Sequence, residues 1–273
     1  MKKAIRKIIA LVLSLLMLAV LTALPALAEE ASLQAILDKG QLILGLDDSF
    51  PPMGFRNEAN EIVGFDIDVA QEVCNRLGVE LVKQPIDWSA KELELAAGNI
   101  DCIWNGMSIT PERQESMSMT FPYLNNAIEV YVKADSGIAT LEDLAGKKVA
   151  VQGASYAEDV INSEEYAQTK ASLGELLSFD DYLTALLDLQ AGGVDAVLMD
   201  RVVGDYKITG MGVTDIKAAF ALADDNFGIG FRKEDGALRD RIEGILIEMK
   251  QDGKLAEIAT QWFGSDLTIV PAE

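Results

Sequence analysis

The sequence predicts an α/β fold in which mainly parallel sheets are flanked by helices. Short apolar segments of strand length alternate along the chain with segments whose apolar residues are spaced for one helix face. Polar residues follow several of the predicted strands, and 49% of the 273 residues are hydrophobic, enough for a sizeable core. Alternating strands and helices form parallel sheets covered on both faces, and their ligands bind beyond the carboxyl ends of the strands.

The first block of alternation begins at an apolar segment, residues 42–46, which predicts a buried strand. The polar residues and prolines of 47–52 predict the loop after it. Residues 65–77 carry apolar side chains at every fourth position and precede Gly78, a pattern typical of a helix and its end. The block continues with a strand at 79–82, a helix near 90–97 and a strand at 101–104.

The last of these strands leads into a helix start that carries an unusual charge. Thr110 and Pro111 read as an N-cap followed by proline at the first helical position. Arg113 then lies in the first turn, where the helix dipole favours negative charge. Either Arg113 is a surface residue paired with Glu112 or Glu115, or it is placed to receive an anion from elsewhere.

A second block of alternation follows in the C-terminal half. It contains a strand at 148–151, a helix that begins near Ser155, a helix at 181–190 and a strand at 196–199. Residues 126–133 and 217–223 read as extended segments between the blocks, so two lobes are expected. The remainder contains one strand and two amphipathic helices, and periodicity leaves open whether it returns to the first lobe.

Four groups of polar residues fall just after predicted strands. They are Asp47, the stretch from Gly106 to Ser108, Ser155 and Asp200. One such residue is an ordinary helix cap, but four groups that include complementary charge predict a ligand site at the ends of the strands.

The first 28 residues have the features of a secretory signal peptide. Lys2, Lys3, Arg6 and Lys7 form a basic region, an apolar run covers 8–24, and Ala26-Leu27-Ala28 fits a cleavage site before Glu29. The alternative is an uncleaved membrane anchor, for which the run is a little short. A lipoprotein is not indicated, because no cysteine lies near the cleavage point. We therefore expect export to a periplasm.

Composition excludes several classes of function. The chain has no histidine, which removes Ser-His-Asp and Cys-His triads and the HExxH zinc site. With the four leader cations removed, 19 basic residues face 44 acidic ones, a net charge of −25. Such a surface repels nucleic acid and anionic lipid, and it suits either solubility alone or small cationic or zwitterionic ligands. Two separate buried thiols are favoured over a disulfide between Cys74 and Cys102. No metal or other cofactor is expected.

Six segments, in order, resemble the family 3 solute-binding proteins, the polar amino acid-binding proteins of bacterial ABC importers. They are DDSFPPMGF, GFDIDVAQEV, NGMSITPERQ, TFPY, LAGKKVAVQGAS and GKLAEIATQWFG. The resemblance as a whole extends from about Leu42 to Gly264. The resemblance implies the two-lobed periplasmic binding protein fold of type II, with the lobes joined by two strands. It assigns residues 29–127 and 221–273 to the first lobe and 128–220 to the second.

The resemblance also implies roles at the two ends of an amino acid. Arg113 matches the arginine that clamps the α-carboxylate, and Asp200 matches the acid that pairs with the α-ammonium. Ser108 matches a position that contacts both groups, and Gly106 matches one whose carbonyl accepts from the ammonium. Ser155 matches a hydroxyl donor to the carboxylate, and it is a helix N-cap candidate as well.

Further positions match the surroundings of the ligand. Trp88 and Phe50 match aromatic residues that cover it, although each is equally suited to a core. Asp47 matches a position that faces the ligand's side chain, where a carboxylate accepts from amide, guanidinium or ammonium groups. Asn105 is polar where many relatives carry a small residue, which leaves the specificity open.

The expected function is therefore capture of a polar amino acid and its delivery to an ABC permease by cleft closure, without catalysis. One alternative is a dehydratase-like cleft enzyme of the same fold, which would need a raised pKa at Asp47 or Asp48. The other is a free-standing sensor subunit. The resemblance implies a monomer.

Overall fold

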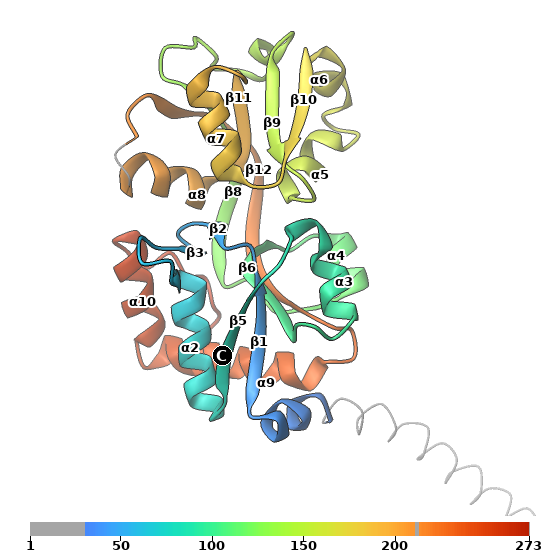
Figure 1. Cartoon of the computed structure of the whole chain (residues 1–273), viewed down its shortest axis with the longest axis vertical. Coiled ribbons are helices and arrows are strands. Elements are labelled where there is room, and N and C mark those ends of the chain that lie inside the picture. The colour runs from blue at the N-terminus through green and yellow to red at the C-terminus, as the bar shows by residue number, and fades with distance from the viewer. Residues whose placement is uncertain (1–30, 211–212, 273) are drawn as a thin grey trace, which may run out of the picture.

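The computed structural model describes residues 31–210 and 213–272, so the predicted signal peptide lies outside the described residues. Figure 1 shows two lobes, with β8 (Leu124–Lys133) and β12 (Ile216–Phe231) running between them. These antiparallel partners contain both of the extended segments that the sequence predicted between the blocks. The two-lobed α/β fold is confirmed.

The first lobe is built on three parallel strands. β1 (Gln41–Leu46) lies between β5 (Glu80–Pro85) and β6 (Cys102–Ser108), and β12 adds an antiparallel neighbour to β6. β7 (Ser118–Met119) pairs with β12. A separate small sheet comprises β2 (Ser49–Phe50), β3 (Gly54–Arg56) and β4 (Ile62–Val63). Residues 31–39 are helical, and the other helices here are α2 (Phe65–Leu77), η1 (Trp88–Ala90), α3 (Lys91–Ala96) and α4 (Pro111–Ser116).

Helix α2 shows how the sequence pattern becomes packing. Its buried side chains include Phe65, Val69 and Val73, which recur at the spacing of one helix face. The helix ends at Gly78, whose φ of 75° is the left-handed conformation that glycine adopts without strain. The predicted helix and its end are both confirmed.

The second lobe repeats the parallel arrangement. β9 (Lys148–Gln152) lies between β10 (Glu175–Phe179) and β11 (Ala196–Asp200), and β11 pairs antiparallel with β8. The helices of this lobe are η2 (Leu141–Leu144), α5 (Tyr156–Asn162), α6 (Ala167–Ser172), α7 (Tyr182–Ala191), α8 (Arg201–Asp205) and η3 (Tyr206–Gly210).

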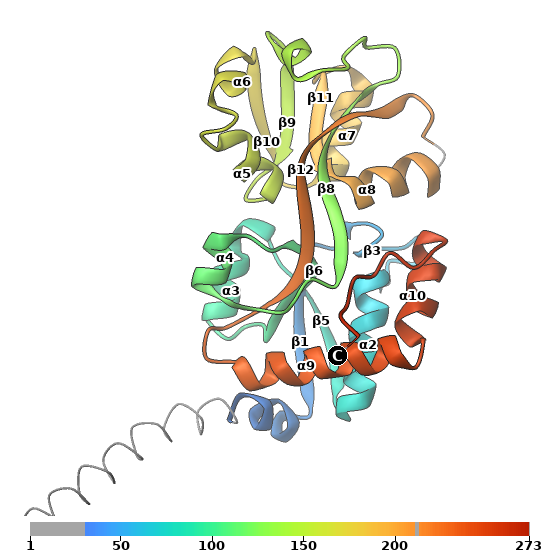
Figure 2. The ribbon, with the colours of Figure 1, turned by 180° about the vertical axis from the view of Figure 1, so that it is seen from behind.

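The C-terminal helices return to the first lobe, which answers the question that periodicity left open. α9 (Gly236–Gln251) and α10 (Lys254–Phe263) both contact α2. The Trp262 indole donates a hydrogen bond to Asp68 at 2.8 Å, and Arg76 forms an ion pair with Asp252 at 2.7 Å. Both views of the ribbon place these helices beside α2 (Figures 1 and 2).

Two expectations need correction. The main sheet is a single mixed sheet of nine strands, because β8 and β12 belong to both lobes and run antiparallel to their neighbours. The stretch from Gly106 to Ser108 lies within β6 and not after it, since the strand continues, fully buried, to Ser108, and Asp200 is likewise the last residue of β11 and not the first residue after it. The preference for separate thiols is confirmed, because Cys74 and Cys102 are both free and buried.

Candidate functional site

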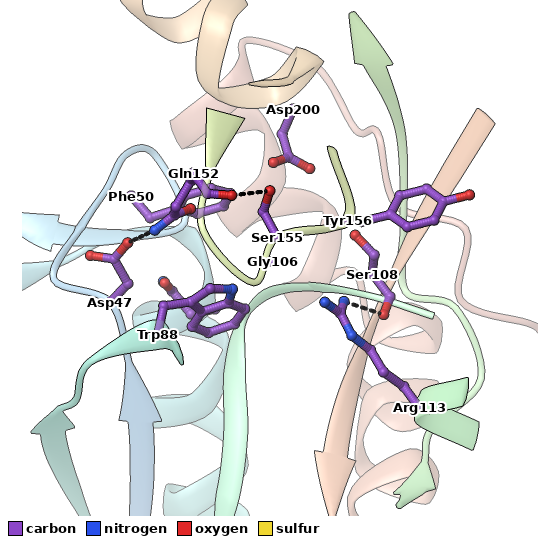
Figure 3. A pocket seen from close by; sticks show the side chains of 11 residues that line it. Asp47, Phe50, Trp88, Gly106, Ser108, Arg113, Gln152, Ser155, Tyr156 and Asp200 are labelled. Carbon is purple, nitrogen blue, oxygen red and sulfur yellow. Dashed lines mark hydrogen bonds between the residues drawn. The ribbon is translucent and has the colours of Figure 1, made fainter. Parts of the chain in front are cut away.

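One cavity between the lobes brings together every residue that the sequence nominated for the site (Figure 3). The cavity is lined by Asp47, Phe50, Trp88, Asn105, Gly106, Ser108, Arg113, Gln152, Ser155, Tyr156 and Asp200. Each of the four polar groups at strand ends is among them. The carboxyl ends of β1, β9 and β11 therefore meet at this cavity, together with the last residues of β6.

The lobes lie closed over this cavity. Its volume is about 10 Å³, about the space that one water molecule needs. The side-chain amide of Gln152 in the second lobe donates to Asp47 in the first at 2.8 Å, and the tilted rings of Phe50 and Tyr182 have centroids 5.9 Å apart. An amino acid is larger than this space, so the lobes must part to admit one.

Arg113 is held at the cavity by the start of α4. The Thr110 side chain accepts a hydrogen bond from the Arg113 backbone N–H at 3.2 Å, which confirms the predicted N-cap. The buried guanidinium donates to the Ser108 carbonyl at 2.9 Å and to the Ala154 carbonyl of the second lobe at 3.4 Å. Its carboxylate neighbour, Asp159, is 3.9 Å away and mostly exposed. With five N–H donors on the guanidinium, donors remain for an anion.

Asp200 lies at the end of β11 on the opposite side of the cavity (Figure 3). It accepts a hydrogen bond from the Asn126 side-chain amide at 2.6 Å. Burial raises the pKa of Asp200 to about 7, and the nearby charge of Asp225 adds to this effect. A cation beside Asp200 would lower this pKa again, because an opposite charge favours the ionised form.

Both serines of the site donate their hydroxyl hydrogens to other groups of the protein. Ser155 caps α5 by accepting from the Glu158 N–H at 3.2 Å, and its hydroxyl donates to the Gln152 carbonyl at 2.7 Å. The Ser108 hydroxyl donates to Asp225 at 2.9 Å. Ser155 would therefore have to leave Gln152 in order to donate to a ligand carboxylate.

Gly106 has a backbone that only glycine adopts easily. Its φ is 59°, and a Cβ there would lie 2.7 Å from Cε1 of Phe50. Its N–H donates to the Asp66 carboxylate at 2.7 Å, and the Tyr123 hydroxyl donates to the same carboxylate. Burial raises the pKa of Asp66 to about 7 despite these hydrogen bonds. Asp66 thus fixes the strand where it borders the cavity.

A carboxylate and an amide form a second polar region of the cavity. Asp47 accepts from the backbone and hydroxyl of Ser49 and from Gln152, and burial raises its pKa. Asn105 is 1% exposed, and within the described residues neither its amide nitrogen nor its oxygen has a hydrogen-bond partner. Buried polar groups are normally satisfied, so Asn105 offers one donor group and one acceptor to whatever occupies the cavity.

The two aromatic residues belong to the hydrophobic core and border the cavity as well. Trp88 and Phe50 are largely buried, and both line the cavity. Beside Trp88, the Lys91 ammonium lies 5.0 Å from the ring centroid and donates to the Trp88 carbonyl at 3.2 Å. Lys91 also donates to the Ala154 carbonyl at 3.0 Å, so it bridges the lobes as Gln152 and Arg113 do.

Sequence reasoning missed two lining residues, Gln152 and Tyr156. Gln152 is the polar residue that ends β9, as Asp200 ends β11, so the rule that identified Asp200 also applies to it. Tyr156 directly follows Ser155 at the start of α5 and carries no comparable signal.

In the part of the chain that the structure describes, no set of three or more Cys, Asp or Glu side chains is arranged to hold a metal ion. The described helices also include none that is both long and apolar enough to cross a membrane.

A cavity between two hinged α/β lobes, with a cation on one side and a carboxylate on the other, defines a two-lobed protein that binds small molecules. The chain belongs to the bacterial extracellular solute-binding proteins, family 3, whose sequence profile matches residues 42–265. This match confirms the resemblance that the motifs suggested.

Several similar proteins bind amino acids. The L-cystine-binding protein TcyJ of Escherichia coli K12 is 30% identical over 88% of this chain and 89% of its own length. The histidine-binding periplasmic protein of the same strain is 32% identical over 82% and 88%. The crystal structure of Tv2483 bound to L-arginine has a TM-score of 0.81 and 32% identity, covering 88% of this chain and 97% of that one.

An ancestral amino acid-binding protein described as a precursor of cyclohexadienyl dehydratase, AncCDT-1, is also similar. Its TM-score is 0.77 and its identity 27%, over 85% of this chain and 99% of that one. This chain therefore shares its fold with a protein described as the precursor of an enzyme, while the relatives named above are binding proteins.

Proposed function

We propose that this protein captures an amino acid outside the cytoplasm and delivers it to the permease of an ABC importer. The observation that carries the proposal is the placement of Arg113 and Asp200 on opposite lobes around one cavity. A zwitterion presents a carboxylate to the guanidinium and an ammonium to the carboxylate. The resemblance to cystine-, histidine- and arginine-binding proteins supports the same ligand class.

Closure and occupancy are coupled by charge. Arg113 and Asp200 are both buried in the closed arrangement, and unpaired buried charges cost several kcal/mol. A bound amino acid pairs with both charges at once, so it stabilises the closed form over the open one. We propose that the permease recognises this closed shape.

The side chain of the ligand would face Asp47 and Asn105. A buried carboxylate accepts hydrogen bonds, and a buried amide both donates and accepts, so the pair suits a polar side chain that bears N–H groups. We therefore expect a polar or basic amino acid. The acidic surface, with a formal net charge of −21, repels anionic ligands.

A thermal-shift screen of the common amino acids and L-cystine tests the proposal. A true ligand at 100 times its Kd adds about 2.7 kcal/mol of stability. A screen in which no amino acid stabilises the protein would refute the function. Product analysis of the ligand after incubation separates binding from catalysis, because a binding protein returns its ligand unchanged.

The variant Arg113→Ala tests the carboxylate clamp. We expect it to weaken binding of every amino acid ligand by about 2–5 kcal/mol, since one partner of a buried charge pair is lost. Isothermal titration calorimetry measures the change. Unchanged affinity would remove Arg113 from the site.

A further inference from the structure

We propose that Asn126 and Asp225, on the two strands that connect the lobes, are positioning residues that make the site discriminate an α-ammonium from an α-hydroxyl. The inference rests on the proposed function and deepens it. Neither residue lines the cavity, and both are buried, at 1% and 4% exposure. They act through Ser108 and Asp200, which do line it.

A chain of hydrogen bonds runs from one lobe to the other through the hinge. Ser108 on β6 donates to Oδ2 of Asp225 on β12 at 2.9 Å. The Asn126 amide nitrogen, on β8, donates to the same oxygen at 2.8 Å and to Oδ1 of Asp200 on β11 at 2.6 Å. Asn126 and Asp225 are directly opposite each other in the β8–β12 ladder, so the two crossing strands themselves set this geometry.

The direction of each bond follows from counting hydrogens. A side-chain amide nitrogen has two hydrogens and no acceptor, so Oδ2 of Asp225 must accept from Asn126. That oxygen also receives the single hydroxyl hydrogen of Ser108. Ser108 is therefore left with lone pairs alone for the cavity, and it can accept from a ligand but cannot donate to one.

Two side-chain acceptors thus border the cavity at the proposed ammonium end, the Ser108 hydroxyl oxygen and the Asp200 carboxylate, in addition to the Gly106 carbonyl that the resemblance assigns to the ammonium. An α-ammonium has three N–H donors and can serve both. An α-hydroxyl group has one donor, so a 2-hydroxy acid leaves one buried acceptor unpaired, which costs binding free energy. The negative charges of Asp200 and Asp225 act in the same direction.

Removing the carboxylate of Asp225 should relax this discrimination. In Asp225→Ala the Ser108 hydrogen is released and can donate to a ligand hydroxyl. Asp225→Asn is the matched control, because its side-chain oxygen can still accept from both Ser108 and Asn126 while the charge is lost. Both variants lose the same charge, so they differ in the hydrogen-bond geometry.

The measurement is the ratio of the Kd for a 2-hydroxy acid to the Kd for the matching amino acid, by calorimetry. The first pairs are L-arginine with L-argininic acid and L-histidine with L-imidazolelactic acid. Any other amino acid that the screen selects is compared with its own 2-hydroxy acid. We expect the ratio to be about tenfold lower in Asp225→Ala than in Asp225→Asn, the equivalent of one hydrogen bond. Equal ratios would overturn the positioning role.

A Ser108→Ala background shows whether Asp225 acts through Ser108. In this background the two Asp225 variants should give the same ratio. The Ser108 hydroxyl, whose hydrogen only one of the two variants still accepts, is absent. A tenfold difference that persists in this background would contradict the inference.

Asn126→Ala carries the test if Asp225→Ala does not fold, as judged by circular dichroism and thermal unfolding. It removes the hydrogen bond from Asn126 that lowers the pKa of Asp200, so this carboxyl group more readily keeps a proton that it can donate to an α-hydroxyl. The wild-type ratio should therefore fall about tenfold, whereas an unchanged ratio counts against the proposal. A wild-type protein that binds no amino acid refutes the proposed function itself. Wild-type binding with unaltered discrimination in the variants refutes only this inference.

Discussion

At the scale of single residues, position relative to the cavity, and not burial, separates the groups that can contact a ligand from the groups that hold structure. Asp66 and Asp200 are both buried, and burial raises the pKa of each to about 7. Asp200 lines the cavity, whereas Asp66 bonds Gly106 and Tyr123 behind it. A raised pKa alone therefore does not mark a ligand contact, and the position of the group relative to the cavity makes the distinction.

Asp66 makes the stability of the ligand-free protein depend on pH. Its pKa rises from an unfolded value of 3.8 to about 7 in the fold, so between these values the native state holds a proton that the unfolded state has released. The free energy of unfolding should then fall as pH rises from about 4 to about 7, by about 1.4 kcal/mol per pH unit for this group. Asp66→Asn removes the titrating group and should flatten the slope.

Urea unfolding of both proteins across this pH range measures the difference. Because Asp200 adds a slope of the same sign, the comparison uses the difference between wild type and Asp66→Asn and not the wild-type slope alone. Parallel curves for the two proteins would show that Asp66 does not titrate in this window.

At the scale of elements, the cap at the start of the short helix α4 positions the Arg113 side chain at the cavity. The helix has six residues, and its cap bond ends on the backbone of Arg113 itself. The sequence identified this cap because capping is local, and it identified Arg113 as a cation where the helix dipole favours an anion.

Thr110→Ala should therefore affect both stability and binding. Loss of the cap costs about 1 kcal/mol of stability, and ligand affinity should fall as well because the guanidinium is less well held. Thr110→Ser keeps the hydroxyl acceptor and serves as the control. Urea unfolding and calorimetry measure the two effects. A Thr110→Ala protein that loses stability but binds with wild-type affinity would separate the cap from the site.

At the scale of the whole molecule, bridges between the lobes hold the closed arrangement. Gln152 bonds Asp47, while Lys91 and Arg113 both donate to the Ala154 carbonyl. Lys91 is 2% exposed, and its ammonium lies against the Ala154 carbonyl and the Trp88 ring and forms an ion pair with Glu92 at 3.4 Å. Burial lowers the pKa of Lys91.

Lys91→Met should shift the ligand-free protein towards the open form. A hydrogen bond from a charged donor is worth about 1.5–3 kcal/mol, and its loss removes one contact that only the closed form makes. Small-angle X-ray scattering should give a larger radius of gyration than wild type. Lys148→Met, which removes an equal charge from an exposed pair with Glu175 in the second lobe, is the control. Equal radii in the wild type and both variants would show that the Lys91 bridge does not govern closure.

The sequence predicted much of the fold because its signals are local. The strand at 42–46, the helix that ends at Gly78 and the helix that begins after Thr110 follow from burial periodicity, caps and glycine. Ligands bind at the carboxyl ends of parallel strands, and this rule predicted from sequence that Asp47, Ser155 and Asp200 belong to one site. The mixed sheet was not predicted, because pairing direction depends on how β8 and β12 cross between the lobes.

By itself, the sequence determined the family, the two lobes and most of the residues that line the cavity, all but Gln152 and Tyr156, since each of these depends on local pattern or on motifs in order. Only the tertiary structure decided which polar groups meet across the hinge. Asn126 is 74 positions from Asp200 and 99 from Asp225, and Asp47 is 105 from Gln152. Periodicity reports whether a residue is buried and not which distant residue it faces, because that choice depends on the path of the chain through both lobes.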